Sequence, residues 1–311
     1  MDEDNSLKGR AVIVTGAAGG IGAATARALA AQGAHLVLVD RAADPLAALA
    51  AELGPDTIAL PSDVTSESDM AHMAQVTLDR WGRIDALVAA AGIQRTGGQP
   101  RPVADTSFAE WRQIIDVNLT GTFLSNRAVL AAMLSQRRGD IVNISSVSGR
   151  QGRAFDGPYA ASKFGIIGLS ESLSEEVSRD GVRVQTVLPD AVDTGIWDQS
   201  GTAALKPRAM LTPDHVASFI LYLLGRRAMP ICSIRSSPRY HCAGAGVALL
   251  PKPCQNRLPT RPAHPKARHD RSASDPAARY HHSTRPRPRA APRSGARRFH
   301  PDRPWRAGRR A

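Results

Sequence analysis

Tyr159 and Lys163 are the residues whose types and spacing first suggest chemistry. They stand four residues apart in the stretch DGPYAASKFG, so both would lie on one face of a helix. A fixed ammonium beside a phenol favours the phenolate and lowers the pKa of the tyrosine, which would make Tyr159 an acid or base usable near neutral pH. The alternative is that Tyr159 packs at a helix start and Lys163 is solvated. For an isolated pair this structural interpretation is favoured. The choice between the two interpretations therefore depends on the rest of the chain.

The elements that would position this pair alternate along residues 7–225. Short apolar runs separated by longer Ala- and Leu-rich stretches predict a parallel sheet with helices on both faces. The predicted strands are nearly all apolar, as expected where both faces of a sheet are buried. We therefore expect an α/β fold, a Rossmann-type doubly wound parallel sheet in a single domain. The strands are expected at 11–15, 35–40, 57–63, 85–92, 139–146 and 182–189, and the helices at 20–33, 44–54, 66–81, 107–117, 121–137, 159–179 and 212–225.

A glycine-rich stretch, TGAAGGIG (15–22), lies between the first strand and the first helix. Glycine there lets backbone N–H groups approach a pyrophosphate, whose negative charge the helix N-terminus favours. Asp40 ends the second strand, where a carboxylate accepts both hydroxyls of an adenosine ribose and repels a 2′-phosphate. Asp40 could instead only cap the strand's exit, and Arg41 could contact a phosphate. The pattern favours NAD as the cofactor over NADP.

Six motifs stand in order on this predicted fold: TGAAGGIG, DV (63–64), AAAG (89–92), VNLTG (117–121), ISSVSG (144–149) and PYAASK (158–163). Together they strongly resemble the short-chain dehydrogenase/reductase family over residues 7 to about 225. Ser146 precedes Tyr159 by 13 residues, which is the spacing that this family uses. The resemblance implies that Lys163 adjusts the pKa of Tyr159, which would explain why the two residues lie on one face of the helix.

The resemblance implies roles residue by residue. Tyr159 would be the general acid/base, and Lys163 would lower its pKa and hold the nicotinamide ribose. Ser146 would hydrogen-bond the substrate oxygen, and Asn118 would shape a helix kink that positions a water. The cofactor would lie along Gly16, Gly20, Ile21, Gly22, Asp40, Asp63, Val64, Ala91, Gly92, Tyr159, Lys163, Pro189 and Thr194. No metal site is expected, because Cys232, Cys242 and Cys254 match no Cys-x-x-Cys spacing.

Three features depart from the family pattern. The usual Asn-Asn-Ala-Gly is AAAG here, and the usual Pro-Gly after the sixth strand is Pro189-Asp190. The third and largest departure is that the chain is expected to lack the family's last strand. The substrate pocket would be lined by 93–101, 150–157 and 190–211. Arg95 and Arg101 in this pocket could bind an acidic group of a substrate. The interpretation that both are solvated loop residues is slightly favoured.

The end of the chain differs in charge from what precedes it. Residues 226–311 carry 21 Lys and Arg against 3 Asp, a net charge of +18, whereas residues 1–225 carry −6. We expect a catalytic domain at 1–227 and a disordered, Arg- and Pro-rich tail at 228–311, because such a segment buries too little apolar surface to offset its ordering entropy. Strand or helix periodicity is almost absent after AGAGVALL (243–250). A shift of reading frame near codon 226 is the simplest hypothesis for its origin.

These observations predict an NAD-dependent oxidoreductase that interconverts a secondary alcohol and a ketone. The alternatives are a non-catalytic dinucleotide-binding protein inactivated by loss of its last strand, and a nucleic-acid-associated protein that uses the basic tail. The first 225 residues contain no feature that favours nucleic acid or a membrane, and no apolar run is long enough to span a bilayer. The acidic start, MDEDNS, is not a signal peptide, so a cytoplasmic location is expected. A homodimer or homotetramer is expected from the resemblance.

Overall fold

The computed structural model describes residues 7–96, 99–198, 207, 209–226 and 245–249. Its centre is a seven-stranded parallel sheet with the order β3-β2-β1-β4-β5-β6-β7. Every neighbouring pair of strands is parallel, which confirms the predicted doubly wound α/β fold. The strands are β1 (Ala11–Thr15), β2 (His35–Asp40), β3 (Thr57–Pro61), β4 (Ala86–Ala89), β5 (Gly139–Ile144), β6 (Val182–Leu188) and β7 (Ala245–Leu249).

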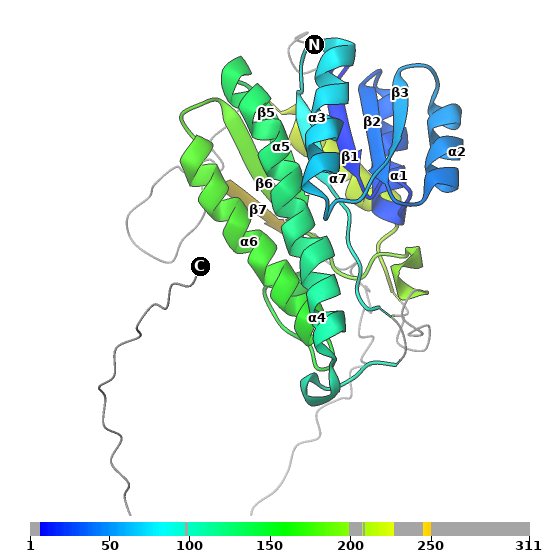
Figure 1. Cartoon of the computed structure of the whole chain (residues 1–311), viewed down its shortest axis with the longest axis vertical. Coiled ribbons are helices and arrows are strands. Elements are labelled where there is room, and N and C mark those ends of the chain that lie inside the picture. Colours follow the sequence, from blue (N-terminus) through cyan, green and yellow to red (C-terminus); the bar gives the residue numbers. More distant parts are fainter. Residues whose placement is uncertain (1–6, 97–98, 199–206, 208, 227–244, 250–311) are drawn as a thin grey trace, which may run out of the picture. The chain divides into compact units, whose positions relative to one another are not determined.

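The described part of the chain holds seven α-helices. They are α1 (Gly20–Ala31), α2 (Ala43–Leu53), α3 (Glu67–Trp81), α4 (Phe108–Ile115), α5 (Gly121–Gln136), α6 (Gly157–Val177) and α7 (Pro213–Gly225). All except α4 contribute to the apolar clusters on the two faces of the sheet. The buried side chains of α1, α2 and α7 form one apolar cluster with alternate strand residues, and those of α3, α5 and α6 form a second cluster on the other face. Figure 1 shows α3, α5 and α6 in front of the sheet and α7 behind it. Val12 and Val14 of β1 pack into one cluster and Ile13 packs into the other, which explains why this strand is apolar up to Thr15.

A five-residue π-helix, Asp116–Thr120, joins α4 to α5. The sequence predicts two separate helices here, but the backbone stays helical from one to the other. A π-helical turn inserts an extra residue and is found frequently at functional sites. Asn118 lies in this turn and is fully buried.

The prediction that the chain lacks a last strand is wrong. Ala245–Leu249 forms β7, which pairs in parallel with β6 from Val184↔Ala245 to Leu188↔Leu249. Strand pairing uses backbone N–H and C=O groups, so a short run such as AGVAL can complete an edge even between polar and Pro-rich segments. This strand lies in the segment that the sequence predicts as a tail.

The chain divides into two compact units, Met1–Asn256 and Arg257–Ala311. The first unit contains the whole sheet. The predicted disorder of the tail concerns residues 228–244 and 250–311, which lie outside the described residues, so it stays a prediction. None of the helices in the described ranges combines the length and apolar character needed to cross a bilayer.

Candidate active site

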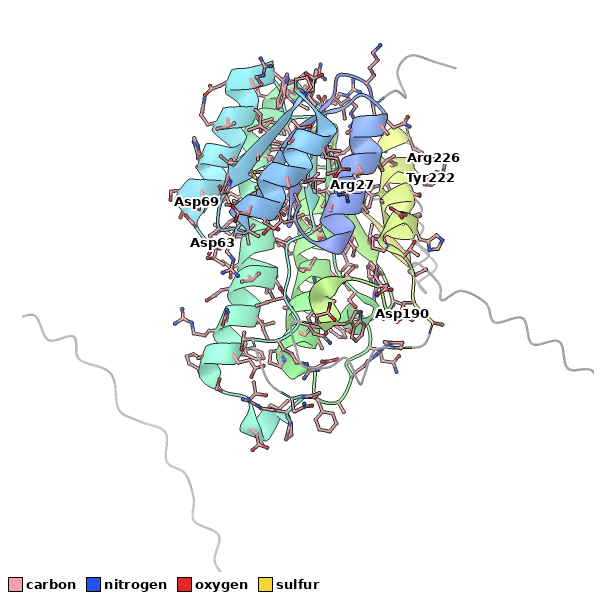
Figure 2. All side chains as sticks on the ribbon, turned by 90° about the vertical axis from the view of Figure 1, so that its right-hand side faces the viewer. Arg27, Asp63, Asp69, Asp190, Tyr222 and Arg226 are labelled. Atoms are coloured by element: carbon pink, nitrogen blue, oxygen red, sulfur yellow. The ribbon has the colours of Figure 1, made fainter. Side chains whose placement is uncertain are left out.

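A cavity of about 380 Å³ opens at the carboxyl ends of the strands. In parallel α/β sheets this is the edge at which ligands bind. The segments that follow β4, β5 and β6 form its walls, together with the start of α6. Figure 2 shows Asp63 toward α3 and Asp190 below α7, at the same end of the sheet. The predicted site residues that line this cavity are Ile21, Gly92, Ser146, Tyr159, Lys163, Pro189 and Thr194.

Three positions of the glycine loop between β1 and α1 leave no room for a side chain. Gly16 has φ +67°, and an added Cβ would lie 2.6 Å from the backbone of Ala91. A Cβ on Gly22 would lie 2.1 Å from the Gly16 carbonyl oxygen, and one on Gly20 would lie 2.5 Å from the Thr194 side chain. The loop is therefore held close to the segments after β4 and β6. α1 begins after Gly19 with no capping side chain and no acidic residue in its first turn, which leaves its N-terminus suited to an anion.

Asp40 and Asp63 lie beyond the cavity, along the same edge of the sheet. The Asp40 carboxylate accepts hydrogen bonds from the backbone N–H groups of Ala18 (3.1 Å) and Ala42 (3.0 Å), so it is fixed against the glycine loop. Asp63 accepts from the amide and hydroxyl of Thr65. Arg41 reaches Asp63 at 3.9 Å and is 62% exposed. The arginine that could contact a phosphate is thus drawn toward a carboxylate.

Tyr159, Ser146 and Lys163 converge on the cavity as their spacing predicts. Ser146 follows β5, and its hydroxyl hydrogen bonds to the side chain of Tyr159 and lowers the pKa of that phenol. Lys163 stands one turn further along α6, with its Nζ 5.6 Å from the centre of the Tyr159 ring. The ammonium donates to the Ile144 carbonyl oxygen at 2.9 Å, and Ser145 donates to the Lys163 carbonyl. β5 and α6 therefore hold the three side chains together.

The expected direction of the Tyr159 pKa is wrong for this structure. Burial is the largest influence and raises the pKa of Tyr159 to about 12, with the Asp156 carboxylate adding to the rise. The hydrogen bond with Ser146 is the largest influence that lowers the pKa of Tyr159, and the charge of Arg153 also lowers it. Burial also lowers the pKa of Lys163 to about 8. Sequence spacing predicts that the two groups are neighbours, but it does not show that both are buried, and burial disfavours the charged form of each.

Asn118 positions the segment after β4 from within the π-helix. Its Oδ1 accepts from the Ile93 N–H at 2.8 Å, and its Nδ2 donates to the Ile93 carbonyl at 2.8 Å and to Ser162 Oγ at 3.0 Å. Ser162 donates in turn to the carbonyl oxygen of Tyr159 at 2.7 Å. A Cβ added to Gly92 would lie 3.4 Å from Asn118 Oδ1 and 3.5 Å from Lys163 Nζ. Asn118 therefore links the kinked helix to the helix that carries Tyr159.

The remaining predicted cofactor residues lie on the walls around the glycine loop. The Pro189 carbonyl accepts from Val147 N–H at 3.0 Å, which fixes the segment after β6 against that after β5. Asp190, which replaces the family's usual glycine, accepts from Arg153 at 3.3 Å and is 10% exposed. Val64 is 6% exposed, and an added Cβ on Gly121 would lie 2.7 Å from its side chain. Val64 is thus a buried contact of α5.

The two arginines predicted as solvated loop residues differ from each other. Arg101 is exposed and lies 4.0 Å from Glu110. Arg95 is only 8% exposed, and its guanidinium donates to Asp156 and, at 2.8 Å, to the Phe155 carbonyl. The preferred interpretation of Arg95 as a solvated residue is therefore wrong. Sequence reasoning also missed Asp156, which lines the cavity and precedes α6, because its partner lies 61 residues away.

The parallel sheet, the glycine-rich loop and the cavity at the carboxyl ends of the strands are together typical of a dinucleotide-binding oxidoreductase. A sequence profile for "short chain dehydrogenase" matches residues 10–204. The chain belongs to the short-chain dehydrogenase/reductase family. It is an oxidoreductase of that family, whose members act on alcohol or keto groups.

Relatives with assigned activities are similar over most of their length. D-threitol dehydrogenase of Mycolicibacterium smegmatis is 37% identical over 242 residues, which cover 74% of this chain and 92% of the relative. The 3-oxoacyl-[acyl-carrier-protein] reductase of Synechocystis is 35% identical over 226 residues, covering 70% and 90%.

Solved structures of reductases are also similar to this chain. Levodione reductase superposes with a TM-score of 0.64 at 31% identity and covers 70% of this chain and 91% of its own. The 3-ketoacyl-(acyl-carrier-protein) reductase from Brucella melitensis, complexed with NADH, has a TM-score of 0.66 at 25% identity, covering 78% and 98%.

Proposed function

We propose that the protein is an NAD-dependent oxidoreductase that interconverts a secondary alcohol and a ketone by hydride transfer. The observation that supports this most directly is the convergence of Ser146, Tyr159 and Lys163 on one cavity next to the glycine loop. Asn118 belongs to the same set, because it fixes the segment after β4 and the start of α6. The retained set argues against a protein that only binds dinucleotides.

The residues around the glycine loop fit a dinucleotide. The uncapped N-terminus of α1 and the close backbone approach at Gly16 and Gly22 suit a pyrophosphate. Asp40 would hold the adenosine ribose, and Asp63 and Val64 would flank the adenine. Ile21, Gly92, Pro189, Thr194 and Lys163 would surround the nicotinamide riboside. The cofactor, when bound, supplies or accepts the hydride.

Tyr159 moves the proton in this proposal. With its pKa raised to about 12 by burial, the phenol is protonated at neutral pH and ready to give a proton to a carbonyl oxygen. Ser146 donates a second hydrogen bond to that oxygen and stabilises the charge that develops there. In the oxidation direction Tyr159 must first lose its proton, and the Lys163 ammonium stabilises the phenolate when it is charged.

NAD is favoured over NADP by the position of Asp40. Its carboxylate is fixed by two backbone N–H groups at the end of β2, where it would repel a 2′-phosphate. Arg41 lies near Asp63, so its charge is partly neutralised by that carboxylate. The proposed partners are a small alcohol or ketone substrate and a second copy of the chain. The proposed location of the protein is the cytoplasm.

The test is the variant Tyr159→Phe, which removes the hydroxyl and keeps the ring. Turnover of ketones with NADH should fall by about 10²- to 10⁴-fold, while NADH binding measured by fluorescence stays close to that of the unmodified protein. Tyr222→Phe is the matched control, because Tyr222 is 51% exposed on α7. Binding of NADH with no turnover of any ketone by the unmodified protein would support the non-catalytic alternative instead.

A further inference from the structure

Asp156 lies in the substrate half of the cavity, next to the proposed acid/base. It directly precedes α6, three residues before Tyr159, and its side chain is 12% exposed. Its charge acts on the phenol, since it is one of the groups that raise the pKa of Tyr159. A hydrogen-bonding group at this position would contact a substrate whose reacting oxygen is bound by Tyr159.

Only one oxygen of the Asp156 carboxylate is used within the described residues. Arg95 donates to Oδ1, and Gln94 donates to the same oxygen from 3.4 Å. The other oxygen, Oδ2, accepts no hydrogen bond from this part of the chain. Asp156 lines the cavity, and Oδ2 is the carboxylate oxygen left for a bound molecule. An ionised carboxylate oxygen accepts hydrogen bonds and donates none, so its natural partner is a hydroxyl group.

The carboxylate is held in place before any ligand arrives. Arg95 donates both to Asp156 and, at 2.8 Å, to the Phe155 carbonyl, and it is almost fully buried. Phe155 has φ +68°, a left-handed conformation that is strained for a bulky residue and is concentrated at ligand sites. The Arg95 contact supports this turn. A fixed acceptor binds a hydroxyl more tightly than a mobile one, because less conformational freedom is lost on binding.

Both arginines that line the cavity are paired with carboxylates, which favours a neutral ligand over an anionic one. Arg95 is matched by Asp156, and Arg153 lies 3.3 Å from Asp190. Lys163 turns its ammonium to the Ile144 carbonyl. A substrate carboxylate would have to displace an aspartate from its arginine, whereas a hydroxyl can use Asp156 Oδ2 without breaking either pair.

We propose that Asp156 is a specificity-determining residue whose Oδ2 accepts a hydrogen bond from a second hydroxyl of the substrate, on a carbon beside the reacting one. The substrates would be small, neutral vicinal diols and α-hydroxy ketones. Asp156 and Tyr159 line the same cavity at the start of α6, so one small molecule can meet both side chains. This inference rests on the proposed function, which supplies the reaction.

The test compares ketones that differ by one hydroxyl. With NADH, the unmodified protein should reduce acetoin with a kcat/KM about 10- to 100-fold above that for butan-2-one, the effect expected of one hydrogen bond to a charged group. In Asp156→Asn the amide oxygen can stay with Arg95 and present an N–H₂ donor where Oδ2 was. The preference should then fall to about twofold or less. Any change in the Tyr159 pKa affects both ketones alike, so the ratio reports the hydroxyl contact alone.

Controls separate the possible failures. Asp105→Asn removes an exposed carboxylate outside the cavity lining and should leave the ratio unchanged. If Asp156→Asn does not fold, the double variant Arg95→Met/Asp156→Asn removes both charges and should lose the preference equally. Saturation-transfer NMR should show butane-2,3-diol bound by the unmodified protein and not by Asp156→Asn, whether or not turnover occurs.

Three results would overturn the inference: equal rates with acetoin and butan-2-one, a preference that survives Asp156→Asn, or faster reduction of acetoacetate than of acetoin. Absence of turnover with every ketone contradicts the proposed function instead. In that case the NMR comparison still decides whether Asp156 binds a diol.

Discussion

Replacing Lys163 with methionine should make the protein more stable at neutral pH while removing its activity. Lys163 is 4% exposed, and burial lowers its pKa from 10.5 to about 8. Because the folded pKa of this base lies below its unfolded value, the cost of burying its charge is present in full below pH 8. Between pH 8 and 10.5 the unfolded chain holds a proton that the folded chain lacks, so the free energy of unfolding rises with pH.

The size of the effect follows from the two pKa values. Each pH unit in that window adds about 1.4 kcal/mol, which gives about 3 kcal/mol in total. The variant also loses the hydrogen bond to the Ile144 carbonyl, which offsets about 1 kcal/mol. Lys163→Met should therefore gain about 2 kcal/mol at pH 7 and should not show the further rise of about 3 kcal/mol between pH 8 and 10.5.

The assay is urea unfolding of the full chain, followed by tryptophan fluorescence at pH values from 7 to 10.5. The difference between the unmodified protein and Lys163→Met removes the titration of all other groups. Lys8→Met, which changes an exposed lysine, should run parallel to the unmodified protein. If Lys163→Met also runs parallel over the whole range, Lys163 does not carry a lowered pKa and the reasoning fails.

Two further predictions concern the cofactor and assembly. Asp40→Ala should narrow the preference for NAD over NADP in kcat/KM by about tenfold, because it removes the repulsion of a 2′-phosphate; equal or better use of NADP by the unmodified protein would contradict the assignment. Large apolar side chains stay exposed on α5 and α6, including Phe123 (41%) and Phe164 (46%), so light scattering at micromolar concentration should show at least a dimer. The double variant Phe123→Glu/Phe164→Glu should shift the protein toward the monomer. A monomeric unmodified protein would contradict this prediction.

Most of the fold could be predicted because the first six strands are mostly apolar runs that alternate with longer Ala- and Leu-rich stretches. β1 and β2 were placed at the residues found, and the other strands within a few residues of their ends. Composition did not predict the π-helix at Asp116–Thr120, since hydrogen bonds one residue longer leave no mark on it. The family resemblance implied only a helix kink at Asn118, which lies in this turn. β7 was missed because AGVAL is short, contains glycine and stands in an Arg- and Pro-rich segment. Its pairing depends on the exposed edge of β6, which lies outside its own sequence.

The site was predictable where residues share one element and not where contacts are distant. Tyr159 and Lys163 share a helix, so spacing alone placed them together. The pair Arg95–Asp156 joins two loops, and neither residue has a pattern that points to the other. The same limit explains the pKa of Tyr159, because burial depends on the walls of the whole cavity.

The buried charges at the two ends of the sheet differ in whether they have a partner of opposite charge. At the amino ends of the strands, Asp140 accepts from Arg10 at 2.5 Å and from Arg183 at 2.6 Å, so both carboxylate oxygens have cationic partners. At the carboxyl ends, Lys163 has a carbonyl for its partner and burial dominates its pKa. A buried charge that lacks an opposite charge lowers the stability of the free protein and would be relieved by a ligand that supplies polar groups. Lys163, at the carboxyl ends of the strands, is therefore a charge that a bound ligand can stabilise. The proposed function places the cofactor ribose at this residue.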